Sequence, residues 1–334
     1  MNCKYILVNG YTATGSSAVV DLLQEFNHMY IPPHEFRLLC DPFGIIDLDR
    51  EINNSVDCLN DDIAIRNFQW LTKKYFKTAK RFGTIGLNYE KDFTKNIRIV
   101  TDEYINKLTN TIYDGYWWFL SLNQSFVTQI TYKILKKLGI YDFRKHCKMR
   151  LVTVSEEEFL RITHEYLDSI FNPLIQKDDI VVLDQAIPAN APGYSRRYFS
   201  NAKVINVDRD ARDVYIHLLQ QEKRSGALIG HPGYDLSKTH NVQLFIDWFK
   251  KYRIPGLPGV SLNIYFEDLI LNYDKTSKLI YDYLGLSESD HITPKKILQV
   301  EKSAKNIGQW KNYPNQEEIR KIEEALPEFL YKGL

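Results

Sequence analysis

The chain has 334 residues, of which 44% are hydrophobic and 25% are charged, and its formal net charge is +1. These values predict one globular domain, with or without a sizeable insertion, and argue against nucleic-acid binding through bulk charge. The four cysteines form no closely spaced pair, which argues against a zinc knuckle or a disulfide framework and fits a reducing compartment.

The chain starts with a strand-like run at residues 4–8, and no basic and apolar leader precedes it. No run of 18 apolar residues occurs anywhere in the sequence, so we expect no transmembrane segment. From these two observations we expect a cytoplasmic protein.

Four short apolar runs have the composition of buried parallel strands, rich in Ile, Val and Leu without alternation. They are Tyr5–Val8, Ile180–Leu183, Val204–Val207 and Leu262–Phe266. Helical patterns follow three of them, at Ser17–Phe26, Asp210–Gln221 and Asp274–Leu284. The alternation predicts an α/β fold of three layers, αβα, with a central and mostly parallel sheet.

Residues of about 45–175 interrupt this alternation. The stretch is aromatic and contains two basic segments: Arg66–Arg98 has nine Lys or Arg and two acids, and Lys133–Arg150 has seven and one. We interpret it as a mostly helical insertion within a single domain of residues 1–334, forming a lid or an acceptor site. The alternative is that these charges are solvated helix faces.

The first predicted strand ends in a loop with two glycines, and a helix follows. Loop amides, a helix N-terminus and hydroxyl donors in this order form a cradle for an anion. Its candidate binding residues are Gly10, Thr12, Ala13, Thr14, Gly15, Ser16 and Ser17. Ser17 is also a plausible N-cap, and the whole turn could instead serve packing alone.

This loop is not that of an ordinary ATPase or GTPase. Such a loop ends in Gly-Lys-Ser/Thr, whereas Gly15 is followed by Ser16 and the loop has no lysine. The sequence therefore predicts a P-loop-type fold and disfavours an ordinary ATPase or GTPase.

A second segment, residues 202–214, reads Ala-Lys-Val-Ile-Asn-Val-Asp-Arg-Asp-Ala-Arg-Asp-Val. It resembles the 3′-phosphate motif of sulfotransferases that use 3′-phosphoadenosine 5′-phosphosulfate (PAPS). A terminal phosphate needs a cationic, bidentate partner, which Arg209 at the end of a strand supplies. The alternative is a surface salt bridge from Arg209 to Asp210 or Asp213.

Three further regions resemble the same family in the same order along the chain. Residues 183–188 are similar to its Asp-Lys-Thr-Pro stretch. Residues 264–269 are similar to its strand that ends in Glu-Asp-Leu, and residues 284–286 are similar to the Phe-Leu-Gly-Leu motif that follows it. Residues 303–311 are similar to its late Gly-x-Trp-Lys nucleotide loop. The resemblance implies PAPS as co-substrate, a structural role for Glu267 and Asp268, and nucleotide contacts from Lys305, Asn306, Gly308 and Trp310. Trp310 is expected to stack on adenine, unless it is a core residue.

The sequence departs from the family at three positions. Ala13 occupies the loop position where the family usually has Lys or Arg. Gln185 replaces the lysine of the Asp-Lys-Thr-Pro stretch, and His217 replaces the serine that lies eight residues after the motif arginine. We expect Lys305 or Arg37 to supply the missing charge. His217 either bonds the 3′-phosphate or is an ordinary helix histidine.

Transfer of a sulfuryl group to an alcohol needs a base that removes the hydroxyl proton. In glycan-modifying members of the family this base is a Glu after the helix that follows the loop, where this chain has Glu35. His34 is the alternative base, Arg37 would orient Glu35 or contact the sulfonate, and Asp41 is a weaker candidate. The alternative is that Glu35 and His34 only satisfy local hydrogen bonds. The remaining histidines have no metal-ligand spacing, so we expect no catalytic metal.

The acceptor is less defined. Aromatic residues at 113–119 and Phe126 could stack on sugars, line a pocket for a sterol or lipid, or be ordinary core. We expect a small-molecule or glycan hydroxyl, more readily of a carbohydrate than of a sterol or lipid alcohol. Two alternatives stay open: a nucleotide-dependent kinase, and a nucleotide-binding protein of this fold without catalysis.

Overall fold

The computed structural model describes residues 3–55, 57–76, 88–122, 124–177, 179–225, 240–253 and 260–334. The chain divides into two compact units, each described here by itself. Unit 1 comprises Met1–Arg37 and Ile175–Leu334, and unit 2 comprises Leu38–Leu174. Part of the basic segment Arg66–Arg98, residues 77–87, lies outside the described residues.

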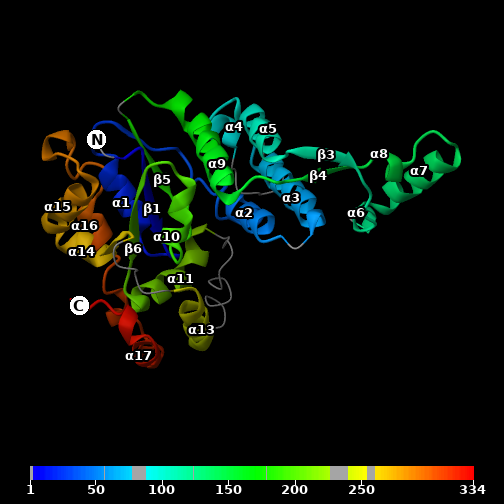
Figure 1. Ribbon diagram of the computed structural model, residues 1–334. Helices are drawn as coiled ribbons and strands as arrows, with labels where there is room; N and C mark the ends of the chain where they lie inside the picture. The colour runs from blue at the N-terminus through cyan, green and yellow to red at the C-terminus, as the bar shows by residue number, and fades with distance from the viewer. Residues whose placement is uncertain are drawn as a thin grey trace. The chain divides into compact units, whose positions relative to one another are not determined.

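Unit 1 is built on a five-stranded sheet in the order β2-β5-β1-β6-β7, in which each neighbouring pair is parallel (Figure 1). Its strands are β1 (Tyr5–Gly10), β2 (Met29–Tyr30), β5 (Ile180–Asp184), β6 (Ala202–Asp208) and β7 (Leu262–Tyr265). The central strand β1 pairs with β5, where Tyr5 lies opposite Val181, and with β6, where Tyr5 lies opposite Ala202. The four predicted strands are confirmed, and β2 was not predicted.

Helices cover both faces of this sheet (Figure 1). On one face, Ile6, Val8, Ile205 and Val207 pack against α1, α14 and α15 in a continuous apolar core. On the other face, Tyr5 contacts Phe199 beside α10 and η3. A second core joins α11, α13 and α17. The chain therefore has the α/β architecture with a parallel sheet that the alternation of strands and helices predicted.

The α-helices of unit 1 are α1 (Ser16–Leu23), α10 (Pro192–Ser195), α11 (Ala211–Ser225), α13 (Val242–Tyr252), α14 (Phe266–Leu271), α15 (Tyr273–Leu284), α16 (Val300–Ala304) and α17 (Gln316–Ala325). Its 3₁₀ helices are η3 (Arg196–Tyr198), η4 (Glu288–Asp290), η5 (Gln309–Asn312) and η6 (Pro327–Phe329).

A buried carboxylate just after α1 anchors the segment 291–298 of the unit. The Glu25 side chain accepts hydrogen bonds from the amides of Lys295, Ile297 and Leu298 at 2.8–2.9 Å. It also lies 2.7 Å from Nε2 of His291, whose ring stacks on Phe26. Because Glu25 is fully buried, these bonds are what makes its burial tolerable.

Unit 2 is mostly helical, with α2 (Ile45–Asn53), α3 (Cys58–Phe76), α4 (Tyr89–Asp92), α5 (Ile97–Leu108), α6 (Phe119–Leu122), α7 (Phe126–Lys137), α8 (Phe143–His146), α9 (Glu156–Phe171) and η2 (Asn172–Leu174). Its core is aromatic: Tyr104 of α5 stacks on Tyr166 of α9 with ring centroids 4.3 Å apart. A two-stranded antiparallel sheet, β3 (Thr111–Asp114) with β4 (Lys148–Leu151), carries α6, α7 and α8 between its strands. Within the described ranges, no helix is long and apolar enough to cross a membrane.

Candidate functional site

The loop between β1 and α1 is a tight turn with little room for side chains. Ala13 and Gly15 both have left-handed backbone conformations, with φ of 66° and 87°. A Cβ on Gly15 would lie 2.6 Å from the Phe266 ring, and one on Gly10 would lie 2.3 Å from the Thr14 hydroxyl. The buried Thr14 hydroxyl donates to the Tyr11 carbonyl at 2.8 Å, which closes the turn. The loop backbone is therefore held in one tight conformation.

The helix α1 begins at Ser16, and its N-cap is Gly15 in the left-handed conformation. The prediction that Ser17 is the N-cap was wrong, because the positive φ of Gly15 starts the helix one residue earlier. Ser17 is exposed in the first turn, and no side chain caps the helix. The Ala18 amide donates to the Gly15 carbonyl at 3.0 Å. Amides in the first turn of a helix have no intrahelical acceptor, and a helix start without a side-chain cap can bind an anion.

Arg209 lies at the carboxyl end of β6 and links two loops. Its side chain donates from Nη1 to the Ala13 carbonyl at 3.1 Å and from Nη2 to the Asn306 carbonyl at 2.5 Å. The residue is only 4% exposed, and its guanidinium lies over the Phe266 ring. The guanidinium is thus held beside the loop between β1 and α1, which we call the phosphate loop for the role proposed below, within reach of an anion bound there.

The neighbouring acids are committed to other partners. Asp210 binds the guanidinium of Arg212 through both carboxylate oxygens, at 2.6 and 2.9 Å. Asp213 accepts from the amides of Gly308 at 2.7 Å and Trp310 at 3.4 Å. Arg209, Asp210 and Asp213 are all buried, so the alternative expectation of a salt bridge at the surface is wrong.

The late loop, residues 303–311, folds against α11 through these bonds. Gly308 has φ of 70°, and the Gln309 side chain donates to the Lys305 carbonyl at 2.9 Å. The Arg212 guanidinium lies 3.6 Å from the Trp310 ring centroid and takes one face of the indole. The rest of that ring packs against the core of α11, α13 and α17. Adenine stacking by Trp310, if it occurs, has to use the opposite face.

The remaining nucleotide candidates differ in exposure. Lys305 is exposed, Asn306 is partly buried, and His217 is partly buried on α11. Glu267, predicted to be structural, is buried and accepts from the Asp210 amide at 3.1 Å. Burial raises the pKa of Glu267 to about 7.

The candidate base region lies after β2, in the part of unit 1 that precedes unit 2. Glu35 and His34 are both exposed, and Arg37 is 3.9 Å from Glu35. The Arg37 guanidinium also reaches the Gln185 carbonyl, at the end of β5, across 3.4 Å. Gln185 in turn donates to the Ser16 hydroxyl at 2.9 Å, which connects this region to the start of α1. Asp41 belongs to unit 2, where the Tyr75 hydroxyl donates to its carboxylate.

Asp184, at the end of β5, lies in the segment 183–188 but was not predicted to be a site residue. Its pKa is raised to about 7, first by burial and then by the charge of Glu35, while hydrogen bonds from Ser16 and Gln185 and the charge of Arg37 oppose the shift. It is therefore an acid that titrates near neutrality beside both the phosphate loop and the candidate base. The only sequence signal for it was its position at a strand's carboxyl end.

Among the described residues, no group of three or more His, Cys, Asp or Glu side chains is arranged to hold a metal ion.

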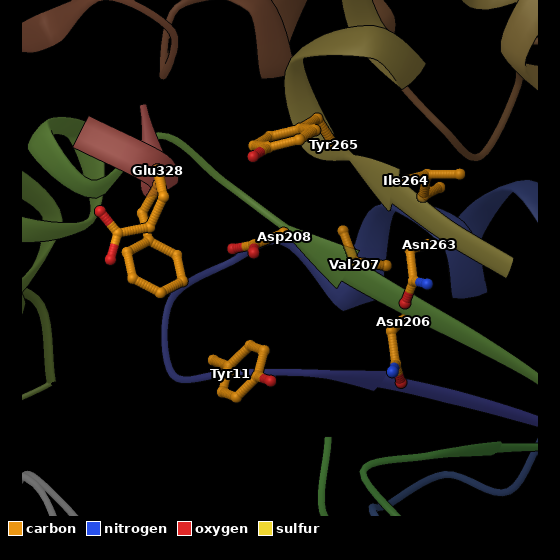
Figure 2. A pocket seen from close by; sticks show the side chains of 9 residues that line it. Tyr11, Asn206, Val207, Asp208, Asn263, Ile264, Tyr265 and Glu328 are labelled. Atoms are coloured by element: carbon orange, nitrogen blue, oxygen red, sulfur yellow. The ribbon is translucent and has the colours of Figure 1, made fainter. Parts of the chain in front are cut away.

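A small cavity of about 110 Å³, whose lining is more apolar than polar, lies beside the phosphate loop at the carboxyl ends of β6 and β7 (Figure 2). Its lining includes two amides, two carboxylates and two phenols: Asn206, Asn263, Asp208, Glu328, Tyr11 and Tyr265. The buried Asn206 Oδ1 has no hydrogen-bond partner in the part of the chain that the structure describes. Asp208 also pairs with Arg253, whose guanidinium lies 4.4 Å from the Tyr11 ring centroid. Tyr11 thus belongs to both the loop and the cavity.

Comparison with known proteins gives matches only among solved structures, since no protein-family model and no curated sequence matches the chain. A sulfotransferase domain from the curacin biosynthetic pathway is 12% identical, with 98% of this chain and 99% of that one covered and a TM-score of 0.39. The sulfotransferase domain of the Synechococcus PCC 7002 olefin synthase is 12% identical over 96% and 93%, with a TM-score of 0.41. A retinol dehydratase in complex with androsterone and the inactive cofactor PAP is 12% identical over 99% and 82%, with a TM-score of 0.35. These structures are of the family that the sequence motifs resemble, but so loose a likeness establishes neither an activity nor a substrate.

Proposed function

We propose that this chain transfers the sulfuryl group of PAPS to a hydroxyl of an acceptor. The observation that carries the proposal is the position of Arg209, which contacts both the phosphate loop at Ala13 and the late loop at Asn306. A nucleotide with phosphate groups on both sides of its ribose needs two anion sites close together. The amides of α1 form the first site, and the Arg209 guanidinium forms the second.

The cradle fits a phosphate for a steric reason as well. At Gly10 and Gly15 the space that a Cβ would need is already filled by the Thr14 hydroxyl and the Phe266 ring. This close packing brings the loop backbone to where a phosphate oxygen can accept from several amides at once. On binding, Arg209 would exchange its carbonyl partners for phosphate oxygens, which form stronger, charge-assisted hydrogen bonds.

The charge near the sulfonate is the weakest part of the match to the family. Ala13 supplies no cation to the loop, and Gln185 binds the Ser16 hydroxyl where the family has a lysine. Arg37 is tied to the Gln185 carbonyl and is therefore our candidate for the missing cation. Lys305, which is exposed on the late loop, is the second candidate.

Glu35 is our candidate for the base. It would take the proton of the acceptor hydroxyl while the hydroxyl oxygen forms a bond to sulfur. The bond from sulfur to the phosphate oxygen breaks in the same step, and adenosine 3′,5′-bisphosphate leaves with the electron pair. Asp184 and His34 are the alternatives, and Asp184 is favoured over His34 by its raised pKa and its contact with the loop.

The acceptor is proposed to be a carbohydrate hydroxyl, with a sterol or other lipid alcohol as the second possibility. In the cavity, carboxylates and amides would hydrogen-bond to sugar hydroxyls and the phenol rings would pack against a sugar face, while its apolar lining would also accept a lipid alcohol. Tyr11 and the free Asn206 Oδ1 would be the contacts nearest the loop.

The experiment is transfer of radioactive sulfur from labelled PAPS to panels of oligosaccharides and sterols, with Glu35→Gln as the matched inactive variant. Label in a product made by the wild type and not by Glu35→Gln supports the proposal. A protein that binds PAPS tightly but labels no acceptor would instead be a nucleotide-binding protein without catalysis, a reading that Ala13 favours. Label transferred from the γ-phosphate of ATP would establish the kinase alternative.

A further inference from the structure

The helix α7 of unit 2 turns its apolar side to solvent. Phe126, Val127 and Ile134 are 76%, 72% and 53% exposed, and Ile130 and Leu138 are exposed beside them. The spacing of Phe126, Ile130 and Ile134 puts them on one face of the helix. A surface helix of a globular protein normally buries such a stripe against its core, so this face is exposed against the usual preference.

The opposite face of α7 is the one that packs. Tyr132 stacks on Phe143 of α8 with ring centroids 5.0 Å apart, and Gln129 donates to the carbonyls of Ser121 and Gln124. Both ends of the helix are capped, by the Ser125 hydroxyl at the start and by Gly139 in a left-handed conformation at the end. The helix is thus fully formed and anchored, and its exposed apolar face is not the result of fraying.

The surroundings of this face are basic. Between Trp118 and Lys148 the chain has six Lys or Arg and one acid, Asp142, although the whole chain carries only +1. Lys133 and Lys137 are exposed, and their spacing from Phe126 and Ile130 puts both lysines along one edge of the apolar stripe. Trp118, which precedes α6, is 61% exposed in the same segment of the unit. Figure 1 shows that α6, α7 and α8 lie together at the end of the β3–β4 pair.

We propose that this surface, formed by Trp118 and α7 with its lysines, binds an anionic lipid membrane. A helix with bulky apolar residues on one side and lysines along its border lies in a bilayer interface with the apolar side inserted and the lysines against lipid phosphates. Tryptophan at such a border is also typical of an interface. The aromatic residues Trp118 and Phe126 are therefore neither core residues nor part of a closed pocket.

The positive charge around α7 favours a membrane over a second copy of this chain as the partner of its apolar face. If two copies packed through α7 about a twofold axis, each would bring the same cluster of lysines toward the other, and like charges repel. An anionic surface neutralises that cluster. The proposal concerns unit 2 alone and does not depend on the proposed transfer reaction.

The test uses the full chain and sucrose-loaded vesicles, of phosphatidylcholine alone or mixed with phosphatidylserine. We expect sedimentation with the mixed vesicles, weakened by salt. Ile134→Ser should weaken binding at least about threefold, because an inserted side chain is lost. Replacing Lys133 and Lys137 together by Gln should weaken it about tenfold or more on the mixed vesicles only.

Matched controls come from α15, which exposes Leu279 and Lys275 in unit 1. Leu279→Ser and Lys275→Gln should bind as the wild type does. Wild-type binding to neither vesicle, or binding that the α7 variants leave unchanged, would overturn the proposal. So would a dimer in sedimentation velocity that Ile134→Ser dissociates while no vesicle is bound, since a second copy then covers the face.

Discussion

Arg209 donates a hydrogen bond from Nη1 to the Ala13 carbonyl at 3.1 Å, across nearly two hundred residues of sequence. With the bond from Nη2 to Asn306, it ties together the loop after β1, the end of β6 and the late loop. These are the three segments that we propose contact the nucleotide. Arg209 is buried and its guanidinium lies over the Phe266 ring, so its side chain is held at the point where the three segments meet.

Removing this guanidinium should weaken binding of adenosine 3′,5′-bisphosphate by about 10- to 100-fold, the cost of losing charged hydrogen bonds. Binding of adenosine 5′-monophosphate, which has no 3′-phosphate, should change much less in Arg209→Ala. Calorimetry with both nucleotides measures the difference, and Arg320→Ala, an exposed arginine on α17, is the control. Equal losses of affinity for the two nucleotides would show that Arg209 does not bind the 3′-phosphate.

The backbone of the loop can be tested separately from its charge. In Gly15→Ala the new Cβ would be strained at a φ of +87° and would clash with the Phe266 ring. We therefore expect a loss of about 2 kcal/mol or more in unfolding free energy and a loss of nucleotide binding. Gly285 on α15 is the matched control, with φ of +73° and open space around its Cβ position. Gly285→Ala should cost only about 1 kcal/mol and leave binding intact. Thermal unfolding measures the stability of the two variants, and calorimetry measures their nucleotide affinity. Similar effects at Gly15 and Gly285 would contradict the steric argument.

Glu35→Gln should leave bisphosphate affinity unchanged and lower turnover on the order of 100-fold or more. The comparison with Asp184→Asn and His34→Gln, assayed for sulfate transfer, assigns the base. If Glu35→Gln keeps wild-type turnover while Asp184→Asn loses it, the acid at the end of β5 is the base instead.

Asp184 also predicts a pH dependence of stability. Its pKa rises from 3.8 to about 7 on folding, so between these values the folded chain holds a proton that the unfolded chain has lost. Unfolding free energy should therefore fall as pH rises through this window, and Asp184→Asn should flatten that slope in thermal unfolding. Glu267 contributes in the same direction, from 4.5 to about 7, so some slope should remain. Glu35→Gln should lower the pKa of Asp184 and so reduce the slope of unfolding free energy against pH. If neither variant changes this slope, Asp184 is ionised in the folded chain.

Ala13→Lys tests whether the loop lacks a cation. Ala13 already has φ of 66°, so a lysine there adds charge without a new backbone cost. A gain in the rate of transfer is expected if the 5′ side is short of positive charge. No gain would mean that Arg37 or Lys305 already supplies it.

The sequence predicted the four longer strands because each is a short run rich in Ile, Val and Leu without alternation, as in a sheet that is covered on both faces. It did not predict β2, which has two residues and therefore no periodicity. It extended β7 by one residue, because Phe266 is apolar like the strand before it but begins α14. Its error at Ser17 has a similar cause, since the start of α1 is set by the φ of Gly15 and not by a side chain.

The two features that the sequence did not reveal are tertiary. The raised pKa of Asp184 depends first on its burial and then on the charge of Glu35, which is far from it in the chain. The exposure of Phe126 depends on which face of α7 packs, and an apolar stripe on its own predicts burial.

Calorimetric titration of the unmodified chain with adenosine 3′,5′-bisphosphate, ADP and ATP tests the central claim most directly. The account predicts that the bisphosphate binds at least about tenfold more tightly than either of the others, since only it places a phosphate at Arg209. ATP binding equal to or tighter than the bisphosphate would contradict it.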